Sequence, residues 1–141
     1  TQRRRQRQMC IRDRYLIDLP NIKWLLENAI AVDPNWQNGT LSAAMMSVYL
    51  NDLSGDKNAQ KKALSYFDLA EKQSNGLNAS IYVTLAENYA VSKQNKQLFI
   101  ELLDKAINID VNRDKSLKQS NKLSQSRAKW LKSRVDDLFY M

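Results

Sequence analysis

The sequence predicts an all-α fold, in which antiparallel helical hairpins stack as a tetratricopeptide-like solenoid fragment that ends in a long C-terminal helix. One pattern of large apolar residues around a small alanine occurs in residues 24–35 and again in residues 100–112. A looser copy places Phe67 and Ala70 at the equivalent positions. Such self-similarity indicates one supersecondary unit used repeatedly, and its copies stack because none can bury its apolar face alone.

Helical periodicity predicts six helices with short connections and gives no strand pattern. They cover, in order, residues 16–32, 35–53, 57–73, 78–91, 98–109 and 115–139. Asp33 and Pro34 separate the first two, because the residue before proline is pushed out of the helical region. Pro34 also suits the first position of the next helix, with Asp33 as its cap. The other predicted caps are Asp56, Asn78 and Asn95 at helix starts, and Gly76 after the third helix.

Residues 1–14 differ from the rest of the chain, since they hold six Arg, one Asp and the single Cys without apolar periodicity. Residues 8–14 resemble the translation of a sequencing-library adapter. We interpret residues 1–14 as an assembly artefact joined to a truncated gene, and residues 15–141 as the helical domain. The alternative is a native, disordered basic arm.

The positive charge of the chain is concentrated in that segment. The 22 Lys+Arg and 15 Asp+Glu of the whole sequence give +7, whereas without residues 1–14 the counts of 16 and 14 give +2. A nucleic-acid-binding function would therefore depend on residues 1–14 alone, and we predict no nucleic-acid partner.

Composition also argues against catalysis and against a membrane span. The chain has no His, so a serine or cysteine triad would lack its usual base, and a zinc site its usual ligands. Asp136 and Asp137 are neighbours that point to different sides of a helix. No run of eighteen apolar residues exists. We predict no catalytic residue, no metal and no cofactor, and a protein that works by binding.

Candidate binding residues follow from the predicted hairpins. In tetratricopeptide arrays the first helix of each hairpin lines the concave face, which here predicts a groove lined by Asn38, Ser42, Met45, Tyr49, Tyr82 and Asn88. The alternative for the aromatic residues is that they fill gaps between stacked helices. Trp130 and Arg134 lie four apart on the last helix, with Arg127 on the same face. They are predicted either to stack on one another or to form a docking surface.

The order and spacing of several segments together are more specific than any one of them. These segments are residues 25–35, 39–41, 55–56, 66–70, 82–91 and 94–103, and Asn121 with residues 127–139. Nearly everything from Trp24 onward resembles the carboxy-terminal half of the T component of TRAP (tripartite ATP-independent periplasmic) transporters. Ser42 and Ala43 depart from the family pattern, which tends to have bulkier polar residues there.

This resemblance implies a non-catalytic, periplasmic lipoprotein of bacteria, built from tetratricopeptide-like hairpins. Members form homotrimers, dock a periplasmic solute-binding protein, and are thought to handle a small apolar ligand. The lipid anchor and the first hairpins are expected outside this chain, and Cys10 does not replace the anchor cysteine because no apolar segment precedes it. The alternative function is a general tetratricopeptide adaptor that binds a peptide in its concave groove.

Overall fold

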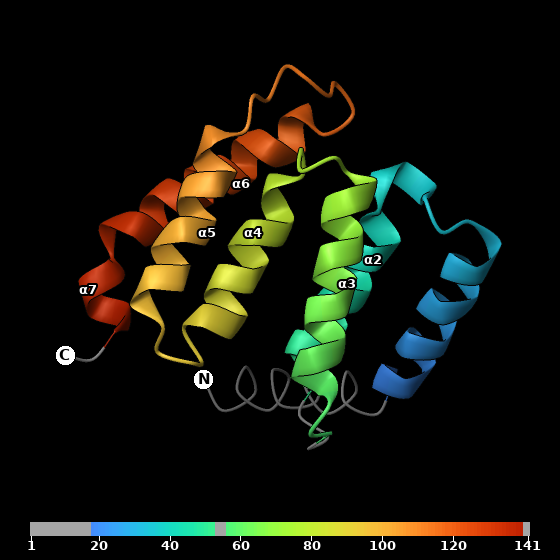
Figure 1. Ribbon diagram of the computed structural model, residues 1–141. Helices are drawn as coiled ribbons and strands as arrows, with labels where there is room; N and C mark the ends of the chain where they lie inside the picture. Colours follow the sequence, from blue (N-terminus) through green and yellow to red (C-terminus); the bar gives the residue numbers. More distant parts are fainter. Residues whose placement is uncertain (1–17, 53–55, 140–141) are drawn as a thin grey trace, which may run out of the picture.

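The computed structural model describes residues 18–52 and 56–139, in which all regular structure is helical (Figure 1). After the helical residues 18–32 come the short helix η1 (Trp36–Asn38), α2 (Thr40–Leu50), α3 (Ala59–Gln73), α4 (Ala79–Leu85), η2 (Ala86–Ala90), α5 (Lys96–Asn108), α6 (Lys118–Ser133) and α7 (Val135–Leu138). The helices up to α5 follow one another across the molecule in chain order, from blue to orange in Figure 1, and α6 packs on both α4 and α5. The all-α prediction is confirmed, and the tetratricopeptide-like solenoid stays a prediction.

The second predicted helix begins later than the sequence indicated. Gln37, Asn38 and Gly39 have φ of 45°, 54° and 87°, so three successive residues adopt left-handed backbone conformations. These conformations cannot continue a right-handed helix. α2 therefore starts at Thr40, and the Asp33 carboxylate accepts a hydrogen bond from the backbone N of Asn35 (3.1 Å) within a turn.

Three predicted caps are confirmed. Asn78 Oδ1 accepts from the backbone N of Ser80 at 3.1 Å, and Asn95 Oδ1 accepts from that of Leu98 at 3.0 Å. Gly76 (φ 70°) follows α3, and its N donates to the carbonyl of Glu71 at 2.9 Å. Each cap satisfies a backbone group that has no partner within its own helix.

The predicted single helix over residues 115–139 is broken at Arg134. Arg134 has φ −114° and ψ 19°, and its N donates to the carbonyl of Leu131 at 3.0 Å, which tightens the last turn of α6. The Arg134 side chain then donates to Asp137 Oδ2 in α7 at 3.0 Å. The C-terminal helix is thus α6 followed by the single turn α7.

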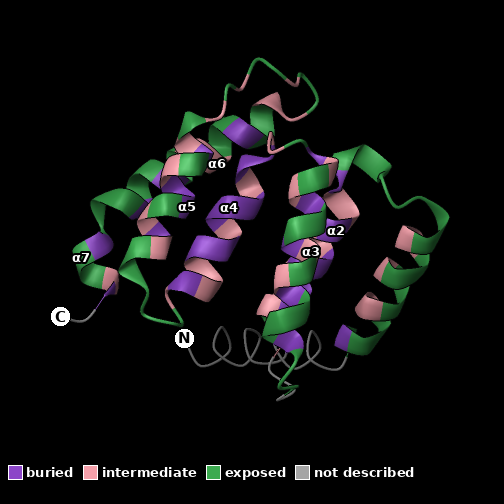
Figure 2. Ribbon diagram, in the orientation of Figure 1, coloured by how far each residue is buried: buried purple, intermediate pink, exposed green. Residues whose placement is uncertain are grey.

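The core lies where facing helices meet. α2 packs along α3, whereas α4, α5 and α6 pack on one another. Figure 2 shows buried positions alternating with half-buried or exposed ones along α3, α4 and α5. The alanines of the repeated pattern take different environments, because Ala70 and Ala106 are buried whereas Ala29 is half-buried. The two buried alanines permit the close helix packing that the repeat predicted.

Candidate functional site

A groove of about 250 Å³ lies between α2 and α4. It is lined by Thr40, Ala43, Ala44, Met46, Ser47, Ser80, Ile81 and Thr84. None of these residues carries a charge, and four of them bear hydroxyl groups. A groove of this kind offers apolar contact and a few hydrogen-bonding groups without the cost of desolvating an ion.

Three of the predicted groove residues lie on another face of α2. Ser42, Met45 and Tyr49 are 0%, 0% and 7% exposed and belong to the buried stripe of the helix. Ser42 Oγ donates to Gln73 Oε1 of α3 at 2.7 Å, and the Tyr49 ring stacks on Tyr66 of α3 with centroids 5.8 Å apart. These side chains join α2 to α3, and none of them lines the groove toward α4.

The remaining predicted groove residues are also separated from one another. Tyr82 is 4% exposed, its ring meets Phe67 edge-on, and its hydroxyl donates to Glu71 Oε1 at 2.8 Å. Asn88 is half-buried, and its Nδ2 donates to the carbonyl of Thr84 at 3.0 Å. Asn38 is exposed and donates to Asp114 Oδ2 at 3.1 Å. The structure does not bring these three residues together.

The Tyr82 phenol borders a second, larger hollow of about 620 Å³. It is lined by Gly76, Tyr82, Glu101, Asp104, Lys105, Asn108 and Ile109. Burial raises the pKa of Tyr82 well above its usual range, and the hydrogen bond to Glu71 and the Glu71 charge act in the same direction. The protonated phenol donates its hydrogen bond to Glu71 Oε1.

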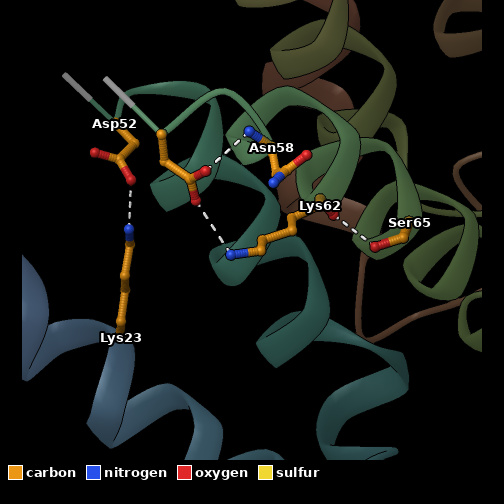
Figure 3. A network of polar contacts seen from close by, with 6 residues as sticks. Lys23, Asp52, Asn58, Lys62 and Ser65 are labelled. Carbon is orange, nitrogen blue, oxygen red and sulfur yellow. Dashed lines mark hydrogen bonds and ion pairs between the residues drawn. The ribbon is translucent and has the colours of Figure 1, made fainter. Parts of the chain in front are cut away.

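An ion pair joins the first described helix to the end of α2 (Figure 3). The Lys23 ammonium contacts Asp52, whose side chain is fully buried, and lies 4.7 Å from the centroid of the Tyr49 ring. Lys62 Nζ also lies 5.4 Å from the same centroid, and it is 3.1 Å from Asp56 Oδ2. Tyr49 thus packs against two cations, which supports a structural role for it.

The α6 cluster predicted around Trp130 is present, and two arginines take part. The guanidinium carbons of Arg127 and Arg134 lie 4.7 Å and 5.4 Å from the centroid of the Trp130 ring, which is consistent with cation–π contact. Arg127 also donates two hydrogen bonds to Glu87 Oε1, at 2.6 Å and 2.9 Å. Trp130 remains 48% exposed, so the cluster is a surface feature.

Two further observations limit the chemistry of the described residues. In residues 18–52 and 56–139, no three His, Cys, Asp or Glu side chains gather closely enough to hold a metal ion. Within the same ranges, no helix has both the length and the apolar character needed to cross a membrane.

The described residues thus form an all-helical fold with an uncharged groove. The family model of the TRAP transporter T-component matches residues 12–139, and the chain belongs to that family. Members of this family are non-catalytic components of transport systems and have an extracytoplasmic role.

The chain is also similar to one curated relative. An uncharacterized protein of Treponema pallidum (strain Nichols) is 28% identical over 115 residues, which cover 82% of this chain and 36% of the relative. The chain therefore spans about a third of the length of the curated relative that it matches. No solved structure matches.

The residues predicted from the sequence to line a groove on α2 lie one position away from those that line the groove between α2 and α4. The buried stripe of α2 contains Ser42, Met45 and Tyr49, and we expected these positions to be accessible. Neighbouring positions, including Ala43 and Ser47, line the groove, about 100° around the helix. A sequence signal for the groove does exist. Small and hydroxyl residues lie on one side of α2, and hydroxyl residues occur again in α4, at Ser80 and Thr84.

Proposed function

We propose that the chain is the part of a TRAP transport component that docks the periplasmic solute-binding protein and passes a small apolar ligand. The groove between α2 and α4 carries this proposal within the family assignment. Its uncharged lining suits an apolar ligand or a neutral loop of a partner, because neither requires an ion to be desolvated.

The docking region is the exposed rim of this groove. Ala44 on α2 and Thr84 on α4 are half-buried, so their side chains are accessible from the groove. Ser42 and Met45 lie behind this rim, where they hold α2 against α3. We propose that they support the docking region without touching the partner.

The assembly that we propose follows the family. The full-length protein is a homotrimer in the periplasm, held at the membrane by a lipid anchor. The groove keeps a fixed width in this proposal, because α2 packs on α3 and α4 packs on α5 and α6.

The test is to block the groove and measure binding to the solute-binding protein of the same transport system. Ala44→Arg and Thr84→Arg each place a guanidinium in the uncharged groove, where a partner could bind only by burying an unpaired charge. We expect each variant to weaken binding at least tenfold in a titration by calorimetry, while the melting temperature changes little.

The matched control is Gln60→Arg, which adds the same group on the exposed surface of α3. It should leave binding unchanged. Unchanged binding in both groove variants would exclude the groove as the docking site. Binding of extended peptides with no binding of the solute-binding protein would instead favour the tetratricopeptide adaptor function.

A further inference from the structure

The outward face of α6 combines exposed apolar residues with an unusual density of cations. Leu123 and Trp130 are seven positions apart, so they share one face of the helix, and they are 75% and 48% exposed. The opposite face contains Asn121, Ala128 and Leu131, which are buried against the rest of the molecule. The two large apolar side chains therefore point away from the core.

Cations flank this apolar pair on both sides. Lys122 and Lys129 each precede an apolar residue by one position, which places both lysines about 100° to one side. Arg127 and Arg134 lie on the other side and approach the Trp130 ring, at 4.7 Å and 5.4 Å from its centroid.

The positive charge of this face has no acidic residues on the same helix to balance it. α6 and the residues that flank it, 115–135 in all, contain seven Lys and Arg and no Asp or Glu. Arg127, Lys132 and Arg134 form ion pairs with Glu87, Asp104 and Asp137. Within the described part of the chain, the exposed side chains of Lys122 and Lys129 take part in no ion pair. The face thus keeps positive charge that attracts an anionic surface.

We propose that this face of α6 binds an anionic lipid bilayer, with Leu123 and Trp130 at the headgroup level and with Lys122 and Lys129 on lipid phosphates. Tryptophan and leucine beside Lys and Arg are the residues of helices that lie in a bilayer interface. A protein partner fits this face less well, because lysine is depleted in protein–protein interfaces. The contact is peripheral and leaves the helix packed on α4 and α5.

The experiment measures binding of the full chain to vesicles and uses Trp130 as its own reporter. Trp24→Phe and Trp36→Phe replace the other two tryptophans, and the six arginines of residues 1–14 are changed to Gln, so that neither obscures the signal from α6. The probes are vesicles of phosphatidylcholine and vesicles of an equimolar mixture of phosphatidylcholine and phosphatidylglycerol.

We expect cosedimentation with the phosphatidylglycerol vesicles alone, with Trp130 emission shifted to shorter wavelength and binding weakened by salt. Lys122→Gln and Lys129→Gln should each lower the affinity about fivefold, and together about thirtyfold. The control is Lys61→Gln with Lys72→Gln, which removes the same charge from exposed positions of α3 and should change little.

Three outcomes would overturn the proposal. The first is unchanged Trp130 emission with anionic vesicles. The second is an equal loss of affinity in the α6 pair and the α3 pair, which would show that only net charge matters. The third is that Lys122→Gln and Lys129→Gln weaken binding to the solute-binding protein and leave vesicle binding unchanged. That result would identify the face as a protein docking surface.

Discussion

Gly39 and Gln73 pack so closely that a β-carbon on Gly39 would lie 2.8 Å from the Cβ of Gln73. Gly39 has a φ of 87° and leads directly into α2. The Gln73 side chain accepts a hydrogen bond from Ser42 Oγ, and its Nε2 donates to the carbonyl of Pro34 at 2.7 Å. These contacts fix the loop before α2, and the α3-facing side of that helix, on the end of α3.

Gly39→Ala should therefore destabilise the fold strongly. A left-handed conformation costs an alanine about 1–2 kcal/mol, and overpacking against Gln73 adds about 1–3 kcal/mol. We expect a loss of about 3 kcal/mol in the free energy of unfolding, measured by urea denaturation.

Gly76→Ala is the matched control, since Gly76 also has a positive φ, of 70°. A β-carbon there would approach the Tyr82 hydroxyl oxygen at 3.5 Å, which is ordinary van der Waals contact. This variant should lose only about 1–2 kcal/mol. Equal losses in the two variants would show that the Gly39–Gln73 contact contributes nothing beyond the glycine conformation.

Local signals made most of the helix boundaries predictable. Asn78 and Asn95 cap helices through hydrogen bonds to residues two and three positions away, so the chemistry is contained in a short stretch of sequence. The late start of α2 was not predictable in this way. It depends on Gly39 meeting Gln73, a contact across 34 residues that no local pattern encodes.

The Asn121 side chain offers a second test of the packing of α6. It is fully buried, its Oδ1 accepts from the backbone N of Ala79 at 2.9 Å, and its Nδ2 donates to the carbonyl of Leu77 at 2.7 Å. Asn121→Ala leaves both backbone groups unpaired, so we expect a loss of about 3 kcal/mol in the free energy of unfolding.

Hydrogen exchange gives this prediction a local readout. The amide of Ala79 should exchange faster in Asn121→Ala than in the wild type, because its acceptor is gone. Gln119→Ala, at an exposed position of the same helix, should change the free energy of unfolding by less than about 0.5 kcal/mol. Wild-type protection of the Ala79 amide in Asn121→Ala would contradict the assigned role.

The stability of the fold should depend on pH in the alkaline range because of Tyr82. Burial, followed by the hydrogen bond and charge of Glu71, raises the pKa of its phenol above the value of about 10 that it has in the unfolded chain. The stabilisation is therefore complete below about pH 10 and is lost as the pH rises, because the unfolded state ionises first. Tyr82→Phe should therefore flatten the fall in melting temperature above about pH 10.

At neutral pH, Tyr82→Phe should lower the free energy of unfolding by about 1 kcal/mol, because the hydrogen bond to Glu71 is lost. Tyr89→Phe, on the partly exposed tyrosine of η2, serves as the control for removing a phenol elsewhere. If it flattens the alkaline slope as much as Tyr82→Phe does, the effect does not belong to Tyr82.

The candidate site shows why faces are harder to predict than helices. Apolar periodicity identifies the buried stripe of α2, but Ser42 belongs to this stripe although it is polar, because Gln73 satisfies its hydroxyl. The sequence contains no sign of that partner. Trp130 and Arg134 were easier, since they are only four residues apart in the sequence and this spacing alone predicts contact.

The Lys23–Asp52 pair should contribute to holding the first described helix on α2. The Asp52 side chain is fully buried, so replacing its cation by Met removes a charged partner from a site with little access to water. We expect Lys23→Met to lose about 2 kcal/mol in urea denaturation and to speed amide exchange in residues 18–32. Lys61→Met, at an exposed position of α3, should stay within about 0.5 kcal/mol of the wild type. Indistinguishable results for the two lysines would mean that apolar contacts of Leu26 and Ile30 hold this helix in place without the ion pair.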